Sequence, residues 1–248
     1  MVTPPATWGG GEYLRLGPGE ERPAIVDALA DGSVPRLAWR NELGGQTWRI
    51  GDRYVKWSPR RLGTDLLAEA ERMRWLEGRH PAPRLLETGE ERTGEDETAQ
   101  GNLSAASPGE SAVAERWRAR PERAVRVIAG GLRRLHALPV DAVPAGWTSW
   151  LTREPAALGP RPPIERPVLA HGDACSPNTL IAPDGSFAAH VDVGDLAVGD
   201  RWADLAVATM AIGWNYGAGW DGAFYDAYGI QPDAERIRWY RALWHAEA

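Results

Sequence analysis

The stretch AHGDACSPNTLIAPDG, residues 170–185, brings three side-chain types that can do chemistry close together. His171, Asp173 and Asn178 stand in one short run, and Pro177 prevents the segment from forming a continuous helix. A carboxylate can orient a hydroxyl group and accept its proton, whereas a carboxamide oxygen can ligate a hard cation. The segment is therefore predicted to be a rigid loop with a base at Asp173 and a metal ligand at Asn178.

A further carboxylate, Asp192, follows on the stretch SFAAHVDVGD (186–195), which we predict to be a strand. An aspartate together with an Asn or Asp is the oxygen set that Mg²⁺ prefers, and substrate phosphates complete its octahedron. The aspartate that is not a ligand can orient an acceptor hydroxyl. The pattern predicts Mg²⁺-dependent chemistry on a substrate that carries phosphates.

Three features nearer the N-terminus fit the same chemistry. The turn NELGGQT (41–47) contains Gly-Gly, and glycines let backbone N–H groups approach phosphate oxygens closely. Lys56 lies in mid-strand, where alternation places it on the same face as Tyr54. Glu69 interrupts the apolar stripe of a predicted helix and needs a partner there, for which Lys56 is the candidate. Each feature also has an ordinary interpretation: a hairpin turn, a surface lysine and a half-exposed glutamate.

Hydrophobic periodicity assigns these residues to a series of elements. We predict strands at 36–41, 46–50, 53–57 and 83–88, a helix at 64–79 capped by Thr64 or Asp65, and helices at 121–137 and 200–214. The acidic, Ser/Gly-rich segment 89–111 is predicted to be a solvated loop or linker. Strands come first and helices later, which predicts two lobes rather than an alternating parallel-sheet fold.

The composition limits the class of protein. The chain has 248 residues, enough for two lobes, and a formal net charge of −6, which argues against a nucleic-acid-binding surface. Its one cysteine, Cys175, excludes an internal disulfide and a cysteine-based zinc site. No apolar run reaches the length of a membrane span, and the N-terminus lacks a signal-peptide pattern. We expect a cytoplasmic protein, a monomer or weak homodimer, that acts on a small molecule and contacts neither nucleic acid nor membrane.

Together, HGDACSPNTLI and HVDVGDLAVGDRWADLA resemble the motifs of the aminoglycoside phosphotransferases, which are part of the protein-kinase-like superfamily. That family carries H-G-D-x4-N, then I-D-x-G, then G-D-x-x-x-D-L-A at the start of a helix. The resemblance implies an α+β, bilobal protein-kinase-like fold, with an N-terminal antiparallel sheet lobe carrying one helix and a mainly helical C-terminal lobe. The expected parts are a nucleotide-binding lobe at 1–100, a hinge at 101–111 and a catalytic lobe at 112–248.

The resemblance also implies an activity: transfer of the γ-phosphate of ATP, with Mg²⁺, to a hydroxyl group of a small cationic acceptor, above all an aminoglycoside antibiotic. Asp173 would be the catalytic base, with Asn178 and Asp192 as the Mg²⁺ ligands. His171 would be a structural member of the loop, and Asp204 would anchor the loop backbone from the following helix.

For the nucleotide, the resemblance implies that Lys56 holds the α- and β-phosphates and pairs with Glu69, while Tyr54 stacks on adenine. The residues that would cover the phosphates are Gly44, Gly45, Gln46 and Thr47. Asp200 is expected to be an ordinary helix N-cap rather than a site residue.

Three departures from the family pattern bear on nucleotide and acceptor binding. The segment 98–111 is polar where the family has an apolar strand whose backbone binds adenine, so preference for ATP or GTP stays open. The segment 138–171 is short where an acidic helical insert is usual. Asp195 stands where several members carry Arg, and an extra acid there could either bind a cationic acceptor or weaken the binding of ATP. The acidic residues considered for the acceptor are Asp195, Glu154, Asp221 and Asp226.

The sequence is also compatible with other acceptors and other protein classes. Related folds phosphorylate macrolides, choline, homoserine and other small alcohols. His171-x-Asp173 and His190-x-Asp192 could instead be paired ligands of a metal-dependent hydrolase, although Lys56 and the glycine turn would then have no use. A polar hinge would also suit a non-catalytic kinase-like binding module.

Overall fold

The computed structural model describes residues 13–17, 21–41, 44–94 and 97–247, and these divide into two compact units. The N-terminal unit contains the described residues of 13–78 and 82–107. The C-terminal unit contains 79–81 and 108–247. Each unit has its own core and is described by itself. No helix within the described ranges is both long enough and apolar enough to cross a membrane.

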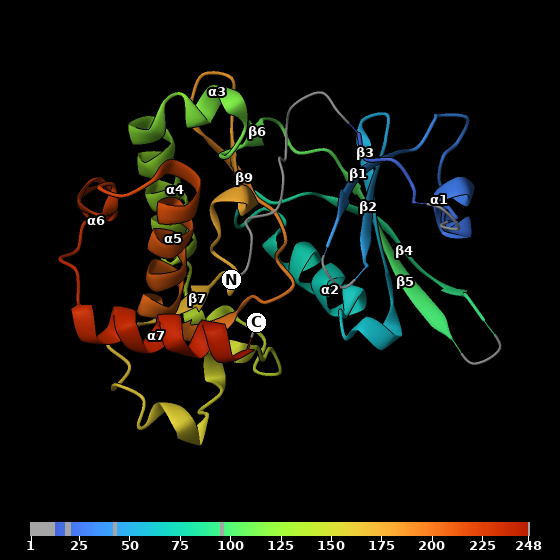
Figure 1. Ribbon diagram of the computed structural model, residues 1–248. Coiled ribbons are helices and arrows are strands. Elements are labelled where there is room, and N and C mark those ends of the chain that lie inside the picture. The colour runs from blue at the N-terminus through green and yellow to red at the C-terminus, as the bar shows by residue number, and fades with distance from the viewer. Residues whose placement is uncertain (1–12, 18–20, 42–43, 95–96, 248) are drawn as a thin grey trace. The chain divides into compact units, whose positions relative to one another are not determined.

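The N-terminal unit is built on one antiparallel sheet with the strand order β1-β2-β3-β5-β4 (Figure 1). Its strands are β1 (Arg36–Arg40), β2 (Gln46–Ile50), β3 (Arg53–Pro59), β4 (Leu85–Arg92) and β5 (Thr98–Ala105). The strands predicted in the first hairpins and after the helix are therefore confirmed. Val26 of α1 (Ala24–Ala28) packs in an apolar core with side chains of one sheet face, among them Trp48 and Val55.

Helix α2 (Leu66–Leu76) begins where Asp65 caps it. Oδ1 of Asp65 accepts hydrogen bonds from the backbone nitrogens of Leu67 (3.1 Å) and Ala68 (3.0 Å), which satisfies two amides of the first turn. Of the two residues proposed as the cap, Asp65 is thus the one that acts. The helix packs against β5 and β4, which places its buried side chains, including Glu69, toward the sheet.

The prediction of a loop at 89–111 is wrong for the residues of β4 and β5 and for Glu110–Ser111, which form the short strand β6. The expected hinge at 101–111 overlaps β5 up to Ala105. The polar residues that suggested a loop make specific bonds to the start of α2. Gln100 Oε1 accepts from Leu66 N at 2.9 Å, and Asn102 Nδ2 donates to Leu66 O at 2.6 Å. Packing explains the glycine at position 101, because a Cβ atom there would lie 2.7 Å from Cδ1 of Ile25.

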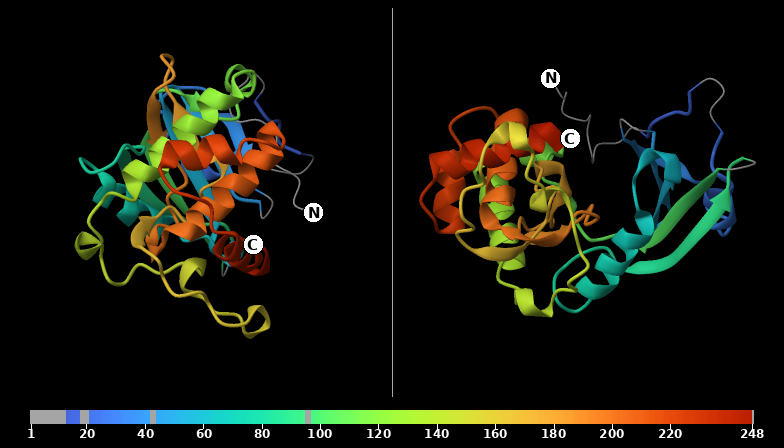
Figure 2. Two further views of the ribbon diagram at one scale, coloured as in Figure 1. Left: turned by 90° about the vertical axis from the view of Figure 1, so that its left-hand side faces the viewer. Right: turned by 90° about the horizontal axis from the view of Figure 1, so that it is seen from below.

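The C-terminal unit is mainly helical, as predicted (Figures 1 and 2). Its helices are α3 (Glu115–Arg118), α4 (Pro121–Leu135), α5 (Arg201–Tyr216), α6 (Asp221–Tyr228) and α7 (Ala234–Glu247). Two small antiparallel sheets join them: β6 (Glu110–Ser111) with β8 (Thr179–Ile181) and β9 (Phe187–His190), and β7 (Pro167–Ala170) with β10 (Ala197–Asp200). Helix α7 packs across α5, and the apolar stripe of α4 faces their common core.

The short segment before the loop 171–178 contains 3-10 turns in place of a helical insert. These turns are Val140–Ala142, Trp150–Thr152 and Ala156–Leu158. The turn at Trp150 contributes to the loop directly, because its indole Nε1 donates to the backbone oxygen of Gly172 at 2.7 Å. The segment therefore supports the loop although it is short.

Candidate active site

Asp204, in the first turn of α5, holds the backbone of the loop 171–178 that follows β7. The two carboxylate oxygens of Asp204 accept from the backbone nitrogens of His171 (2.6 Å) and Gly172 (3.0 Å). The predicted anchoring role of Asp204 is confirmed by these bonds. Gly172 has φ +83°, and a Cβ atom on it would collide with the backbone oxygen of Asp195, so glycine is required there.

Asp204 is itself held by His136 at the end of α4. His136 Nε2 lies 2.9 Å from Asp204 Oδ2, and its Nδ1 lies 2.8 Å from the hydroxyl of Tyr228. Burial alone would oppose ionisation of Asp204, but the bonds from His136 and the backbone of His171 outweigh it and lower the pKa of Asp204. A buried carboxylate bonded to His136 and to the backbone nitrogens of His171 and Gly172 fixes the geometry of the loop that it binds.

Asp173 and Asn178 interact directly on this loop. Nδ2 of Asn178 donates to Asp173 Oδ2 at 2.8 Å and to the backbone oxygen of Asp173 at 3.0 Å. Asp173 Oδ1 is buried with no hydrogen-bond partner among the described residues. Burial, followed by the negative charge of Asp192, raises the pKa of Asp173. The arrangement leaves one carboxylate oxygen of Asp173 for a hydroxyl donor.

Asp192 lies two residues after the end of β9 rather than on a strand, so the strand predicted at 186–195 is wrong beyond His190. Asp192 has φ +59°, the left-handed conformation, which ends the pleat and exposes its side chain. The carboxylate of Asp192 and Oδ1 of Asn178 form a set of hard oxygen donors whose chemistry fits Mg²⁺.

In the N-terminal unit, Lys56 and Glu69 form the predicted ion pair. Lys56 Nζ lies 2.7 Å from Oε1 of Glu69, whose side chain is 5% exposed. Tyr54 is half-buried two residues earlier on β3, and the guanidinium of Arg49 lies 5.9 Å from the centre of its ring. The pairing of Lys56 with Glu69 is confirmed, whereas contacts of either residue with a nucleotide stay predictions.

The glycine turn between β1 and β2 is closed by Asn41. Gly44 N donates to Asn41 O at 3.1 Å, and Gly45 N donates to Oδ1 of Asn41 at 2.6 Å. Gly44 has φ +100°, and a Cβ atom on Gly45 would lie 2.8 Å from Asn41 Nδ2. Gln46 Oε1 accepts from the indole of Trp48 at 2.8 Å, and Thr47 is buried beside Lys56 in register on β3. Glu42 and Leu43 lie outside the described residues.

The sequence and fold comparisons agree on one family. A model of the phosphotransferase enzyme family matches residues 149–240. An aminoglycoside 3'-phosphotransferase of Streptomyces fradiae is 32% identical over 237 residues, which cover 77% of this chain and 84% of that enzyme. This chain belongs to the aminoglycoside phosphotransferase family. The predicted family, the kinase-like fold and the predicted class of enzyme, a phosphotransferase, are thereby confirmed.

Two further members of the family resemble this one over most of its length. The streptomycin 3''-kinase of Streptomyces griseus is 27% identical, with 92% of this chain and 96% of that enzyme covered. The solved aminoglycoside phosphotransferase APH(3'')-Id of Streptomyces rimosus superposes with a TM-score of 0.67 at 28% identity, covering 88% and 93% of the two chains. That enzyme has also been solved in complex with ADP and streptomycin.

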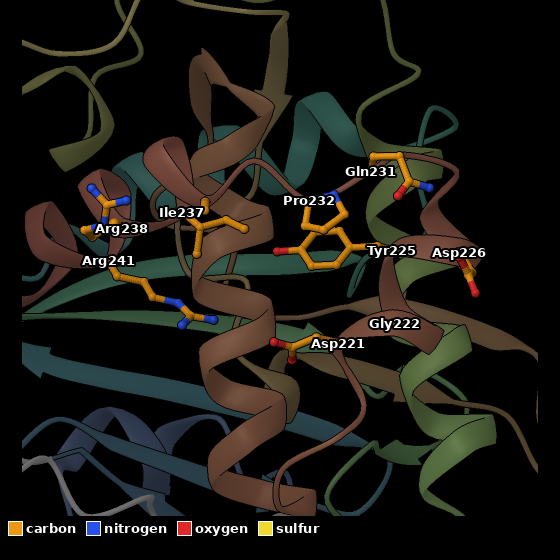
Figure 3. Close-up of a pocket in the computed structure, with 10 residues that line it drawn as sticks. Asp221, Gly222, Tyr225, Asp226, Gln231, Pro232, Ile237, Arg238 and Arg241 are labelled. Atoms are coloured by element: carbon orange, nitrogen blue, oxygen red, sulfur yellow. The ribbon is translucent and has the colours of Figure 1, made fainter.

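The acids considered for the acceptor of this aminoglycoside phosphotransferase do not form one cluster. Asp195 is exposed three residues after Asp192, and Glu154 pairs with Arg161 at 3.4 Å. Asp221 and Asp226 both belong to α6 and line a pocket of about 560 Å³, to which Arg238 and Arg241 of α7 also contribute (Figure 3). The two arginines balance the two acids, so this pocket is not an acidic one.

The sequence did not reveal several residues that hold the loop 171–178 and that lie far from it in sequence. Trp150 and Tyr228 gave no signal, because each bond depends on a tertiary contact. His136 could have been found, since it follows Leu132 and Leu135 on the buried stripe of α4 and a polar ring there needs a partner. The helix N-cap at Asp200 was recognised, and its Oδ1 does accept from Trp202 N at 3.3 Å.

The geometry gives no support to the hydrolase alternative. Asp192 is exposed, whereas His190 is buried with its ring against His80, so the two do not share a face. The family assignment leaves the chain among phosphotransferases.

Proposed function

We propose that this chain transfers the γ-phosphoryl group of ATP to a hydroxyl group of an aminoglycoside. One observation carries the proposal: Asn178 holds Oδ2 of Asp173 through Nδ2 and keeps its own Oδ1 as a ligand atom. The same loop thus offers a carboxylate oxygen for an acceptor hydroxyl and an oxygen for a cation. This pairing of functions is what phosphoryl transfer needs, because the reaction depends on positioning and on charge neutralisation.

Asp173 orients the acceptor in this proposal. Its Oδ1 accepts the hydrogen bond of the acceptor hydroxyl, which directs the hydroxyl oxygen toward the phosphorus atom. The raised pKa of Asp173 suits its role as the acceptor of the hydroxyl proton, since a carboxylate of higher pKa binds a proton more strongly. Asp204 keeps Asp173 in place by fixing the backbone of the two preceding residues.

Asn178 and Asp192 are proposed to hold Mg²⁺. When bound, the cation neutralises the charge that gathers on the phosphate oxygens. Lys56 is proposed to bind the α- and β-phosphates, and Glu69 fixes the direction of its ammonium group through the 2.7 Å ion pair. Gly44, Gly45, Gln46 and Thr47 are proposed to cover the phosphates, and Tyr54 to stack on the base.

The acceptor is proposed from the relatives. Their names specify aminoglycoside 3'-phosphotransferases and a streptomycin 3''-kinase, and one solved relative binds ADP and streptomycin. Of the four acids considered, we propose Asp195 as the contact for an acceptor ammonium group, because it follows Asp192 closely and is exposed. We also propose a cytoplasmic location, since ATP is the phosphoryl donor.

A panel assay tests the proposal. Purified protein with Mg²⁺ and ATP is offered aminoglycosides, macrolides, choline and homoserine, and ADP release is coupled to a dye, with product phosphorylation checked by mass spectrometry. We expect acceptor-dependent ADP release with at least one aminoglycoside. Release with only another alcohol would contradict the acceptor class, and no release with any acceptor would favour a non-catalytic module.

A further inference from the structure

Two histidines that the proposed chemistry does not use form a buried pair in the C-terminal unit. His80 and His190 are 4% and 2% exposed. Nε2 of His80 lies 3.0 Å from Nδ1 of His190, and the two rings stack with centres 5.0 Å apart. Residues 79–81 are a three-residue segment of the C-terminal unit, whereas the residues before and after them belong to the N-terminal unit.

The surroundings of this pair are shaped to hold it. Pro81 O accepts a hydrogen bond from the backbone nitrogen of His190 at 3.0 Å, so the segment 79–81 is also bonded to the end of β9. The ring of Phe187 packs against both histidines, with centres 5.5 Å and 4.8 Å away. Gly131 of α4 makes room, since a Cβ atom there would lie 2.6 Å from Phe187 and 3.1 Å from Nε2 of His190.

The His80–His190 pair is connected to the loop 171–178 through His171. The rings of His190 and His171 meet edge to face with centres 5.1 Å apart. Nδ1 of His171 accepts from Asp173 N at 3.3 Å, which leaves the proton on Nε2, and Nε2 donates to Val191 O at 3.1 Å. Residue 191 is therefore held by the same ring that contacts the backbone of Asp173.

The backbone before Asp192 is bonded on several sides. His190 N donates to Pro81 O, and Val191 N donates to Asn178 O at 2.9 Å. Asp192 itself is in the left-handed conformation, with φ +59°. Aspartate adopts that conformation more readily than most non-glycine residues, but the conformation still costs energy and is stabilised here by the surrounding bonds. The bonds of the two residues before Asp192 provide this stabilisation. His80 contributes the side-chain bond to His190, beside the backbone bond of His190 to Pro81 and its pairing with Thr179 on β8.

We infer that His80 is a positioning residue that acts through His190 to keep Asp192 in the conformation in which its carboxylate serves a metal ion. The inference rests on the proposed function for the role of Asp192, although the pair itself does not. Burial lowers the pKa of His80 to about 3, with Arg134 and neighbouring histidines acting in the same direction. The ring is thus neutral at pH 7, so that one ring of the pair donates and the other accepts.

Two substitutions at one position separate positioning from core filling. His80→Phe keeps a ring of similar size and removes the hydrogen bond, whereas His80→Gln keeps a polar group at the reach of Nε2. The matched control is His245→Phe, at an exposed histidine near the end of α7. The readout is Mn²⁺ affinity in the presence of a non-hydrolysable ATP analogue, measured by electron paramagnetic resonance, together with kcat and the acceptor KM.

We expect His80→Phe to weaken Mn²⁺ binding by about tenfold or more, as substitutions behind a metal ligand generally do. The kcat should fall in parallel, the acceptor KM should stay unchanged, and His80→Gln should recover most of the loss. His245→Phe should match the wild type in every readout. Unchanged Mn²⁺ affinity in His80→Phe, or a His80→Gln protein no better than His80→Phe, would overturn the inference and leave the pair as core packing.

A second measurement covers the case in which His80→Phe does not fold. Imidazole ¹⁵N spectra of the wild-type protein should then show two neutral rings with one nitrogen of each in a shared hydrogen bond, and absence of that bond overturns the inference. A wild-type protein that binds Mn²⁺–nucleotide but releases no ADP with any acceptor would contradict the proposed function alone. Mn²⁺ binding needs no turnover, so the two failures are distinguishable.

Discussion

The carboxamide of Asn178 holds the carboxylate of Asp173 in place, with Nδ2 2.8 Å from Oδ2 and 3.0 Å from the backbone oxygen of the same aspartate. One side chain thereby orients the proposed base and supplies a proposed metal ligand, so its removal should affect two steps at once. Asn178→Ala should lower kcat and raise the Mg²⁺ concentration needed for half-maximal activity by about tenfold or more. Titrating Mg²⁺ at saturating ATP measures both.

The matched control for that substitution is Asn215→Ala. Asn215 lies on α5, where its Nδ2 donates to Ala211 O at 2.8 Å, and the change removes the same group at a position without a proposed role. An Asn178→Ala protein with the Mg²⁺ requirement of the Asn215→Ala protein would show that the cation is held elsewhere.

Removing the anchor of the loop should cost stability as well as activity. Asp204→Ala leaves the amides of His171 and Gly172 and the ring of His136 without their buried acceptor. We expect the free energy of unfolding, measured with urea, to fall by about 3 kcal/mol or more. Asp233→Ala removes a half-buried cap of α7 and should cost only about 1 kcal/mol. Equal losses would show that Asp204 is no more than a cap.

The neutral His80 gives stability a defined pH dependence. Its pKa is about 3 in the folded protein and about 6.5 in an unfolded chain, so only the unfolded chain binds this proton between those values. Stability from this group is complete above pH 6.5 and is lost as the pH falls toward 3. Between pH 7.5 and 5.5 the wild type should therefore lose about 1 kcal/mol more than His80→Phe. Urea unfolding at both pH values tests this, and equal losses would mean that His80 is protonated when folded.

Substituting Tyr54 tests how the protein binds the nucleotide base. The expectation differs from the one drawn from the sequence alone, because β5 stands where a polar loop was predicted. Because residues 98–105 form a strand beside β3, with Ser104 in register with Tyr54, the base is not left to a disordered polar loop. Stacking contributes about 1–3 kcal/mol and tolerates any base, so Tyr54→Ala should raise KM for ATP and for GTP by a similar factor of about five or more. Tyr54→Phe should keep both values. A KM that is unchanged in Tyr54→Ala would remove Tyr54 from the site.

The sequence predicted those parts of the molecule whose local pattern and tertiary use agree. The strands around Lys56, the helix capped by Asp65 and the ion pair of Lys56 with Glu69 all follow from alternation, capping chemistry and the cost of a buried charge. Asp204 was placed correctly by its motif and position at the start of α5.

The parts that were missed depend on contacts distant in sequence. Gln100, Gly101 and Asn102 look like loop residues, yet they bond to α2 and accommodate Ile25 on a strand. The left-handed turn at Asp192 and the pairing of His80 with His190 are set by tertiary bonds that no local pattern encodes. Propensity is a weak guide where tertiary contacts determine the conformation.

The central claim is that Asp173 positions an acceptor hydroxyl for phosphoryl transfer. The most direct test is acceptor-dependent ADP release by wild-type protein and by Asp173→Asn, with ATP binding of both measured by calorimetry. We expect Asp173→Asn to keep its fold and its nucleotide affinity and to lose at least about a hundredfold in kcat, the scale of a lost proton acceptor. A kcat within tenfold of the wild type, with nucleotide affinity intact, would contradict the account.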